Sequence, residues 1–319
     1  ASGSDVPARQ LTYAQALAEA QAQAMRRDPK VVLLGLDIGR FGSHEGQTKG
    51  LWEEFGDQRV LDMPIVEATI VGAGTGAAMA GYRPIVSLAE LPIASVAGDE
   101  LFNVLPTSRY MSGGQYTVPL VVRANLSAPR GGSGPTFGPI QTNPLHAILT
   151  HIPGVHVAIP STPYDAKGLL LTAIACDGPV YFIEHRALMQ SRGPVPEAEY
   201  YVPFGQAVVR RTGTDVTIVA ISWMVERALA AAEELASAGI HAEVIDPRTL
   251  VPFDIETVIN SVAKTRYLVT VDQGYRRLNA SSDIVAEVAE RLGPSVRGYK
   301  RIAAPNAPVP ASAALTAPF

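Results

Sequence analysis

Cysteine is almost absent from this sequence of 319 residues. Its one thiol, Cys176, excludes an intramolecular disulfide and a zinc site built from several cysteines. The formal net charge of -4 leaves no basic excess of the kind that nucleic-acid-binding proteins use. No uninterrupted apolar run reaches the roughly 18 residues of a membrane span, and no charged-then-apolar leader opens the chain. These features predict a cytoplasmic protein without nucleic-acid or membrane partners.

Several catalytic motifs are also missing. The sequence has no G-x-S-x-G elbow, no Walker P-loop and no pair of carboxylates with evident spacing. His146, His151 and His156 recur every five residues, a spacing that matches neither a helix face nor a strand face, so no metal site is expected. The chain alone therefore shows no complete active site, and catalysis would need a cofactor or another chain.

What the sequence does have is a regular alternation of helical stretches and apolar runs. The runs are short and bounded by turn residues, as in strands that a parallel sheet buries on both faces; they include 31–38, 118–123 and 180–184. The pattern predicts an α/β fold with a doubly wound, mostly parallel sheet. We expect a first domain at 10–189, a proline-containing linker at 190–204, and a smaller α/β domain at 205–319.

One carboxylate, Glu67, stands among apolar neighbours and leads into a run of glycine and alanine. In apolar surroundings the charged form of a carboxyl group is disfavoured, so such an acid can donate or share a proton near neutral pH. The alternative is that Glu67 begins a helix, where the helix dipole favours an acid, and does no chemistry. The residue type and its setting leave both interpretations open.

The glycine run after Glu67 matches the G-x-G-x-x-A form of a dinucleotide fingerprint at 72–77. The strand expected next, at 83–89, contains no acidic residue, so a small-residue helix that packs closely on another helix is favoured over a Rossmann-type dehydrogenase. A second irregular segment, 128–144, is rich in glycine and proline. A loop of that length in a compact domain is usually functional or mobile.

The order of motifs resembles one family over nearly the whole chain, from Leu11 to about Pro310. It resembles the beta subunit of the thiamine diphosphate-dependent decarboxylating component of 2-oxo acid dehydrogenases, of the pyruvate and branched-chain types, in the transketolase-like superfamily. The residues that carry the resemblance are Thr48-Lys-Gly-Leu51, Pro64-Ile65 with Glu67, Gly76-Ala-Ala-Met-Ala-Gly81 with Arg83-Pro84, Tyr110-Met-Ser-Gly-Gly114, Ile152-Pro-Gly154, Pro160-Ser-Thr-Pro-Tyr-Asp-Ala-Lys-Gly-Leu169, Glu184-His-Arg186 and Asp246-Pro-Arg-Thr-Leu-Val-Pro-Phe-Asp254.

The resemblance implies a pyrimidine-binding domain followed by a transketolase C-terminal domain. It also implies an α2β2 heterotetramer, in which an alpha subunit holds the diphosphate through Mg²⁺ with a Gly-Asp-Gly motif that this chain lacks. A lipoyl acyltransferase is a further possible partner. A monovalent cation such as K⁺ is expected at backbone carbonyls near 173–178.

Site residues carry over from the family motif. Glu67 aligns with the acid that hydrogen-bonds the aminopyrimidine ring and activates the cofactor ylid for decarboxylation of a 2-oxo acid and acyl transfer. Ile65, Leu91 and Ile93 align with the segments that contact the cofactor, and Ile93 stands where the family usually has an aromatic residue.

Gln141 is the main departure from the family, because it aligns with a histidine that assists acyl transfer to the lipoyl group. Glutamine can hydrogen-bond but cannot deliver a proton near pH 7. This favours, as an alternative, a thiamine diphosphate-dependent carboligase or acyltransferase with a non-lipoyl acceptor. Asp272-Gln273-Gly274 and Ala311 also differ from the family pattern, in regions that contribute to subunit contacts and carrier docking.

Overall fold

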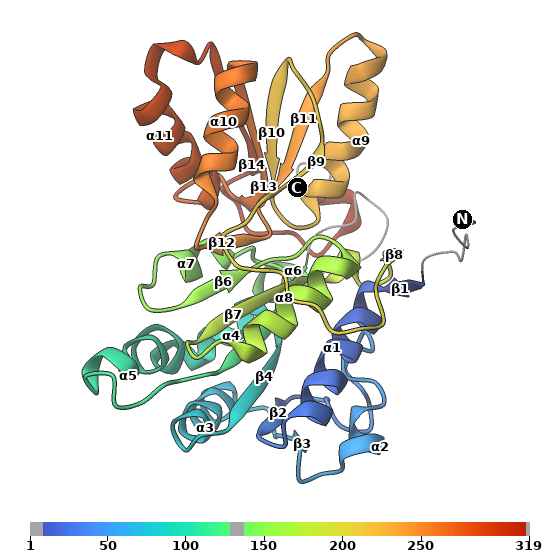
Figure 1. The fold of residues 1–319 in the computed structure, drawn as a ribbon, viewed down its shortest axis with the longest axis vertical. Coiled ribbons are helices and arrows are strands. Elements are labelled where there is room, and N and C mark those ends of the chain that lie inside the picture. Colours follow the sequence, from blue (N-terminus) through green and yellow to red (C-terminus); the bar gives the residue numbers. More distant parts are fainter. Residues whose placement is uncertain (1–8, 128–136, 317–319) are drawn as a thin grey trace, which may run out of the picture.

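The structure is a computed structural model that describes residues 9–127 and 137–316. It shows two α/β parts stacked along the long axis, with the C-terminal part at the top in Figure 1. Most of the irregular segment expected at 128–144 lies outside the described residues. No helix within the described ranges is long and apolar enough to cross a membrane.

The first part is built on a sheet to which seven strands of the described chain contribute, in the order β12-β6-β7-β5-β4-β2-β3. All neighbours are parallel except β12 and β6. This confirms the mostly parallel, doubly wound sheet. The strands are β2 (Val31–Gly35), β3 (Val60–Asp62), β4 (Arg83–Glu90), β5 (Val121–Leu126), β6 (His156–Ala158), β7 (Val180–His185) and β12 (Thr249–Val251).

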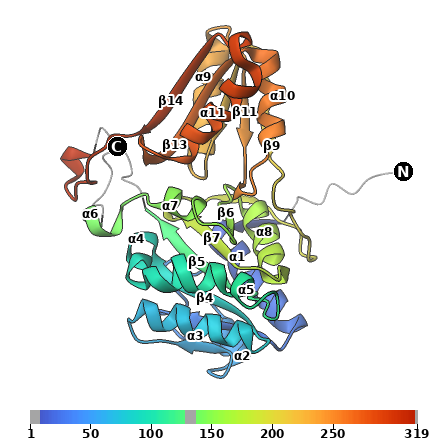
Figure 2. The same ribbon diagram turned by 90° about the vertical axis from the view of Figure 1, so that its left-hand side faces the viewer.

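Helices cover both faces of this sheet (Figure 2). One face carries α1 (Tyr13–Arg27) and α8 (Pro163–Ala175); the other carries α3 (Glu67–Met79), α4 (Leu91–Ala94), a short 3-10 turn (Ser95–Ala97), a π-helical turn (Glu100–Val104) and α5 (Leu105–Met111). Shorter elements are α2 (Leu51–Phe55), α6 (Gly138–Gln141), α7 (His146–Thr150) and the 3-10 turn Arg186–Leu188. A capping box is present at the start of α1: Gln15 N–H donates to Thr12 Oγ1 at 3.1 Å, and Thr12 N–H donates to Gln15 Oε1 at 2.9 Å.

The second part has a smaller sheet of five strands among the described residues, in the order β14-β13-β10-β11-β9. Helix α9 packs on one face, and α10 and α11 pack on the other (Figure 1). The elements are β9 (Val208–Arg211), β10 (Val216–Ala220), α9 (Met224–Ser237), β11 (Ala242–Asp246), α10 (Ile255–Thr265), β13 (Tyr267–Tyr275), α11 (Ala280–Leu292), β14 (Gly298–Ala304) and the 3-10 turns Gly293–Ser295 and Ala313–Leu315.

The two parts are tied together by pairings that the alternation of helices and strands does not predict. Strand β12 comes from the C-terminal half but extends the first sheet, antiparallel to β6. Within the expected linker, β8 (Arg192–Pro194) pairs with β1 (Gln10–Thr12). Buried Lys167 then donates to the carbonyls of Pro196, Glu197 and Ala198 at 2.7–3.0 Å, so this segment is firmly held.

Candidate functional site

Glu67 is the first residue of α3, which starts soon after the edge strand β3. Its side chain is almost fully buried, with 4% of the residue exposed. Among the described residues, no side chain or backbone group hydrogen-bonds its carboxylate. A buried polar group normally has a partner, so Glu67 stands out as a buried acid at a helix start that has none among the described residues.

The residues beside Glu67 are apolar and unusually open. Ile65 is 79% exposed and Val66 is 45% exposed. On the neighbouring segment after β4, Leu91 is buried and Ile93 is half-buried in α4. The side chains expected to contact the cofactor are therefore apolar, and the described residues leave Ile65 largely uncovered.

The glycine run lies inside α3 and not before it. Helix α3 begins at Glu67, so Gly72 sits one and a half turns into the helix and its N–H group is within the helical hydrogen-bond ladder. A pyrophosphate cradle needs free N–H groups at a helix N-terminus. The dinucleotide-binding interpretation of 72–77 is therefore wrong.

The glycines of α3 lie on two faces of the helix with different surroundings. A Cβ atom at Gly74 would lie 2.6 Å from Val86 Cγ2, so this glycine lets the helix approach β4 closely. A Cβ atom at Gly76 would meet no atom within 4 Å. The exposed face around Gly72, Ala73 and Gly76 consists of small residues, as the packing interpretation requires, and among the described residues only the Glu100 side chain comes near a Cβ built at Gly72 or Gly76, 3.9 Å from the one at Gly72.

Gln141 ends the short helix α6 and is half-buried, with no hydrogen bond to its side-chain amide among the described residues. The segment that follows is anchored to the C-terminal part. Tyr275 Oη donates to Asn143 Oδ1 at 2.6 Å, and His146 Nε2 lies 2.9 Å from Asp272 Oδ1. The C-terminal part thus holds the chain directly behind Gln141.

His146 and Asp272 are both fully buried. Burial opposes ionisation of the acid, but His146 and the N–H of Gly274 together hold the pKa of Asp272 below its ordinary value. The other two spaced histidines do not join this pair, and in the part of the chain that the structure describes no group of three or more histidine, cysteine or acidic side chains could hold a metal ion.

A cluster at the carboxyl edge of the first sheet was not predicted from the sequence. Arg186, just after β7, forms ion pairs with Glu90 at the end of β4 and with Glu45 in the loop after β2. Ser127, after β5, donates its hydroxyl to Glu90 Oε2 at 2.7 Å. Burial raises the pKa of Glu90, against the opposing effects of Arg186 and Ser127. No local pattern could reveal this cluster, because its members come from four separate loops.

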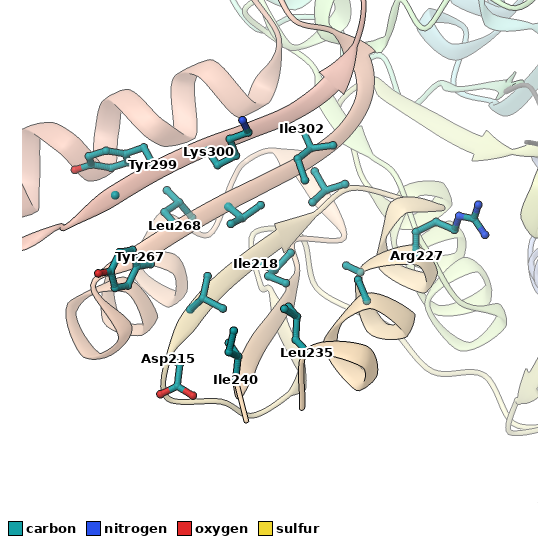
Figure 3. A pocket seen from close by; sticks show the side chains of 16 residues that line it. Asp215, Ile218, Arg227, Leu235, Ile240, Tyr267, Leu268, Tyr299, Lys300 and Ile302 are labelled. Atoms are coloured by element: carbon teal, nitrogen blue, oxygen red, sulfur yellow. The ribbon is translucent and has the colours of Figure 1, made fainter. Parts of the chain in front are cut away.

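A separate apolar groove of about 750 Å³ lies on the second sheet (Figure 3). Its walls come from β10, β13 and β14 and from one side of α9, and include Ile218, Leu235, Tyr267 and Tyr299. None of the five predicted site residues lines it. The groove is therefore not part of the candidate site at the first sheet.

Comparison with known proteins agrees with this architecture. The model of the transketolase pyrimidine binding domain matches residues 9–191, and that of the transketolase C-terminal domain matches 205–319. A solved structure described as a split gene transketolase, inactive beta4 tetramer, superposes with a TM-score of 0.72 over 92% of this chain and 89% of its own, at 24% identity. That likeness shows the fold.

Two relatives are much closer in sequence. The beta subunit of acetoin:2,6-dichlorophenolindophenol oxidoreductase from Cupriavidus necator is 43% identical over 97% of this chain and 93% of its own length. The beta subunit of the pyruvate dehydrogenase E1 component from Bacillus subtilis is 38% identical over 96% of this chain and 93% of its own length. The chain thus belongs to the transketolase-like family of beta subunits of thiamine diphosphate-dependent 2-oxo acid and acetoin dehydrogenases.

Proposed function

We propose that this chain joins an alpha subunit in an α2β2 heterotetramer and supplies the pyrimidine half of a thiamine diphosphate site for decarboxylation of a 2-oxo acid and acyl transfer. The observation that carries the proposal is the buried, unpartnered carboxylate of Glu67 beside the exposed Ile65. The residues fit the cofactor, because an aminopyrimidine offers a hydrogen-bonding ring nitrogen and an apolar ring face. We take residues 10–189 and 205–319 as its two domains, joined by 190–204.

Each predicted residue has a physical task in this proposal. Glu67 would hydrogen-bond the ring nitrogen of the pyrimidine and so help to activate the cofactor, and the apolar side chains beside it would limit competition from water. Ile65, Leu91 and Ile93 provide apolar contact for the ring. Gln141 donates or accepts a hydrogen bond at the acyl group but moves no proton. When bound, thiamine diphosphate supplies the carbon nucleophile and the electron sink for the reaction.

Two metal ions belong to this proposal: Mg²⁺ bound by the alpha subunit and K⁺ bound by backbone carbonyls of this chain. We assign Mg²⁺ mainly to the alpha subunit. For K⁺, the carbonyls of Ile174 and Cys176 already accept hydrogen bonds from Arg83 Nη1 at 3.0 and 3.1 Å. A monovalent cation near 173–178 would therefore use the remaining carbonyls of that segment. We place the assembly in the cytoplasm, which suits a chain with one cysteine.

A second candidate keeps the cofactor but changes substrate or acceptor. Gln141 favours an acceptor other than a lipoyl group, as in a carboligase or acyltransferase. The relative from Cupriavidus necator is named for acetoin as substrate and a dye as oxidant, which makes acetoin a candidate substrate here as well.

The test assembles the chain with its alpha subunit, thiamine diphosphate and Mg²⁺. Pyruvate, branched-chain 2-oxo acids and acetoin are compared with the dye as oxidant, alongside acylation of a lipoyl domain and C–C bond formation with an aldehyde. Efficient lipoyl acylation would remove the case for the second acceptor. The proposal as a whole fails if Glu67→Gln turns over like wild type. Glu53→Gln is the matched control, because Glu53 lies on an exposed part of α2 and makes no hydrogen bond or ion pair among the described residues.

A further inference from the structure

Arg186 occupies a central position at the carboxyl edge of the first sheet. Its Nη2 donates to Glu90 Oε1, and its Nη1 donates to Glu45 Oε1 at 3.1 Å. Its guanidinium carbon lies 4.7 Å from the centre of the Phe137 ring, a cation–π contact. One side chain thus touches residues of three loops that are far apart in the sequence.

Two of these contacts fall at the starts of the helices that carry the candidate site. Glu90 is the N-cap residue of α4, which contains Leu91 and Ile93. Phe137 is the N-cap residue of α6, which ends at Gln141. Helices α4 and α6 also lie against each other. Arg186 therefore contacts the residue immediately before each of the two segments.

Neither helix is stabilised by its own residues alone. Each has only four residues, and neither N-cap side chain makes a capping hydrogen bond. Helices this short are not stable in isolation, because the first turn costs more conformational entropy than its hydrogen bonds return. Their placement depends on tertiary contacts, and Arg186 supplies one to each.

We propose that Arg186 is a positioning residue that sets α4 and α6 relative to each other, and so couples contact with the cofactor to transfer of the acyl group. The inference rests on the proposed function for what the two helices do. That Arg186 contacts both segments follows from the geometry alone and does not depend on the proposed function.

The chemistry of the guanidinium makes the two contacts separable. The ion pair with Glu90 needs positive charge and a donor, which lysine also has. The contact with Phe137 needs a flat cation that can lie over a ring, which arginine offers and an ammonium group offers less well. Arg186→Lys should therefore keep the ion pair that positions α4 and lose much of the cation–π contact that positions α6.

The experiment measures amide hydrogen exchange in peptides that cover α4 and α6, in the assembled heterotetramer. In Arg186→Met we expect amide exchange to accelerate about tenfold in both segments together. A change of this size corresponds to the loss of one hydrogen bond to a charged group. In Arg186→Lys, exchange in α6 should accelerate and exchange in α4 should stay near wild type. Arg26→Met, which removes an exposed ion pair with Glu54, is the matched control and should change neither segment.

Activity gives a second readout. The affinity for thiamine diphosphate should fall about tenfold in Arg186→Met and recover in Arg186→Lys, while the rate of acyl transfer should stay low in both. Exchange that is unchanged in both segments, or that accelerates throughout the chain in parallel, overturns the inference. A wild-type assembly that binds no thiamine diphosphate would refute the proposed function instead, and the exchange comparison would still decide the role of Arg186.

Discussion

The close approach of α3 to β4 can be tested with one substitution at two positions. A Cβ atom at Gly74 would lie 2.6 Å from Val86 Cγ2 and 3.1 Å from Leu120 Cδ1, while one at Gly76 would meet nothing within 4 Å. Carbon atoms pack at about 3.5–4.0 Å, so alanine at position 74 must push the helix outward by roughly 1 Å. Val86 is fully buried and β-branched, so its methyl group cannot swing aside.

The energies can be estimated for each position. Overpacking of this kind costs about 1–3 kcal/mol, and alanine gains about 1 kcal/mol over glycine from helix propensity. Gly74→Ala should therefore destabilise the chain by about 1 kcal/mol, and Gly76→Ala should stabilise it by about 1 kcal/mol.

Urea unfolding of the two variants beside wild type measures the free energy of unfolding of each. The gain in helix propensity is common to both variants, so the difference between them isolates the packing cost at β4. Equal free energies of unfolding for the two variants would refute the reasoning, because the clash at Gly74 would then cost nothing.

Four further predictions concern single side chains. Glu67→Gln should nearly abolish cofactor-dependent turnover while leaving assembly with the alpha subunit intact, which gel filtration and a dye-reduction assay measure together. Gln141→His should raise lipoyl-domain acylation about tenfold or more, since general acid catalysis typically contributes at least that much; an unchanged rate would place Gln141 away from the acyl group. Burial raises the pKa of Glu90 above its ordinary value of 4.5, so the folded chain holds this proton more tightly than the unfolded chain. The contribution of Glu90 to stability is full below pH 4.5 and is lost as pH rises through the folded pKa. In Glu90→Gln the free energy of unfolding, measured by urea unfolding, should therefore depend less on pH above 4.5. The pKa of Asp272 is lowered in the folded chain, so its contribution to stability is present above its ordinary pKa and is lost as pH falls through the folded pKa. Asp272→Asn should therefore lower the free energy of unfolding by about 3 kcal/mol at pH 7 and change it little in strong acid. Urea unfolding at the two pH values measures this.

The features that local sequence could predict are those whose causes lie within a few residues. The capping box at Thr12 and Gln15 is one, because both partners belong to the same helical turn. The buried run of β2 is another, since apolar residues on both faces of a strand require cover on both sides. Such elements were predicted with bounds that differ from the structure by only a few residues.

Features that depend on distant partners could not be predicted in this way. Strand β12 has three residues and exists because it pairs with β6, roughly ninety positions earlier in the chain. The pair of His146 and Asp272 likewise joins a helix of the first part to a strand of the second. Neither residue has a neighbour in sequence that signals the other, so only the folded chain brings them together.

The candidate site shows why a complete active site could not be found in this sequence. The side chain of Glu67 is buried, with 4% of the residue exposed, but its carboxylate has no partner in the described chain, and the adjacent Ile65 is left largely open. Next to them, the small-residue face of α3 presents backbone that a second helix could approach within a short distance. Each feature is unfavourable or unused in the isolated chain: Glu67 and Ile65 lie at the start of α3, and the small residues lie on its exposed face. A second subunit that packs over the start of α3 would cover Ile65 and enclose a ligand against Glu67, so the same association would complete both the interface and the site.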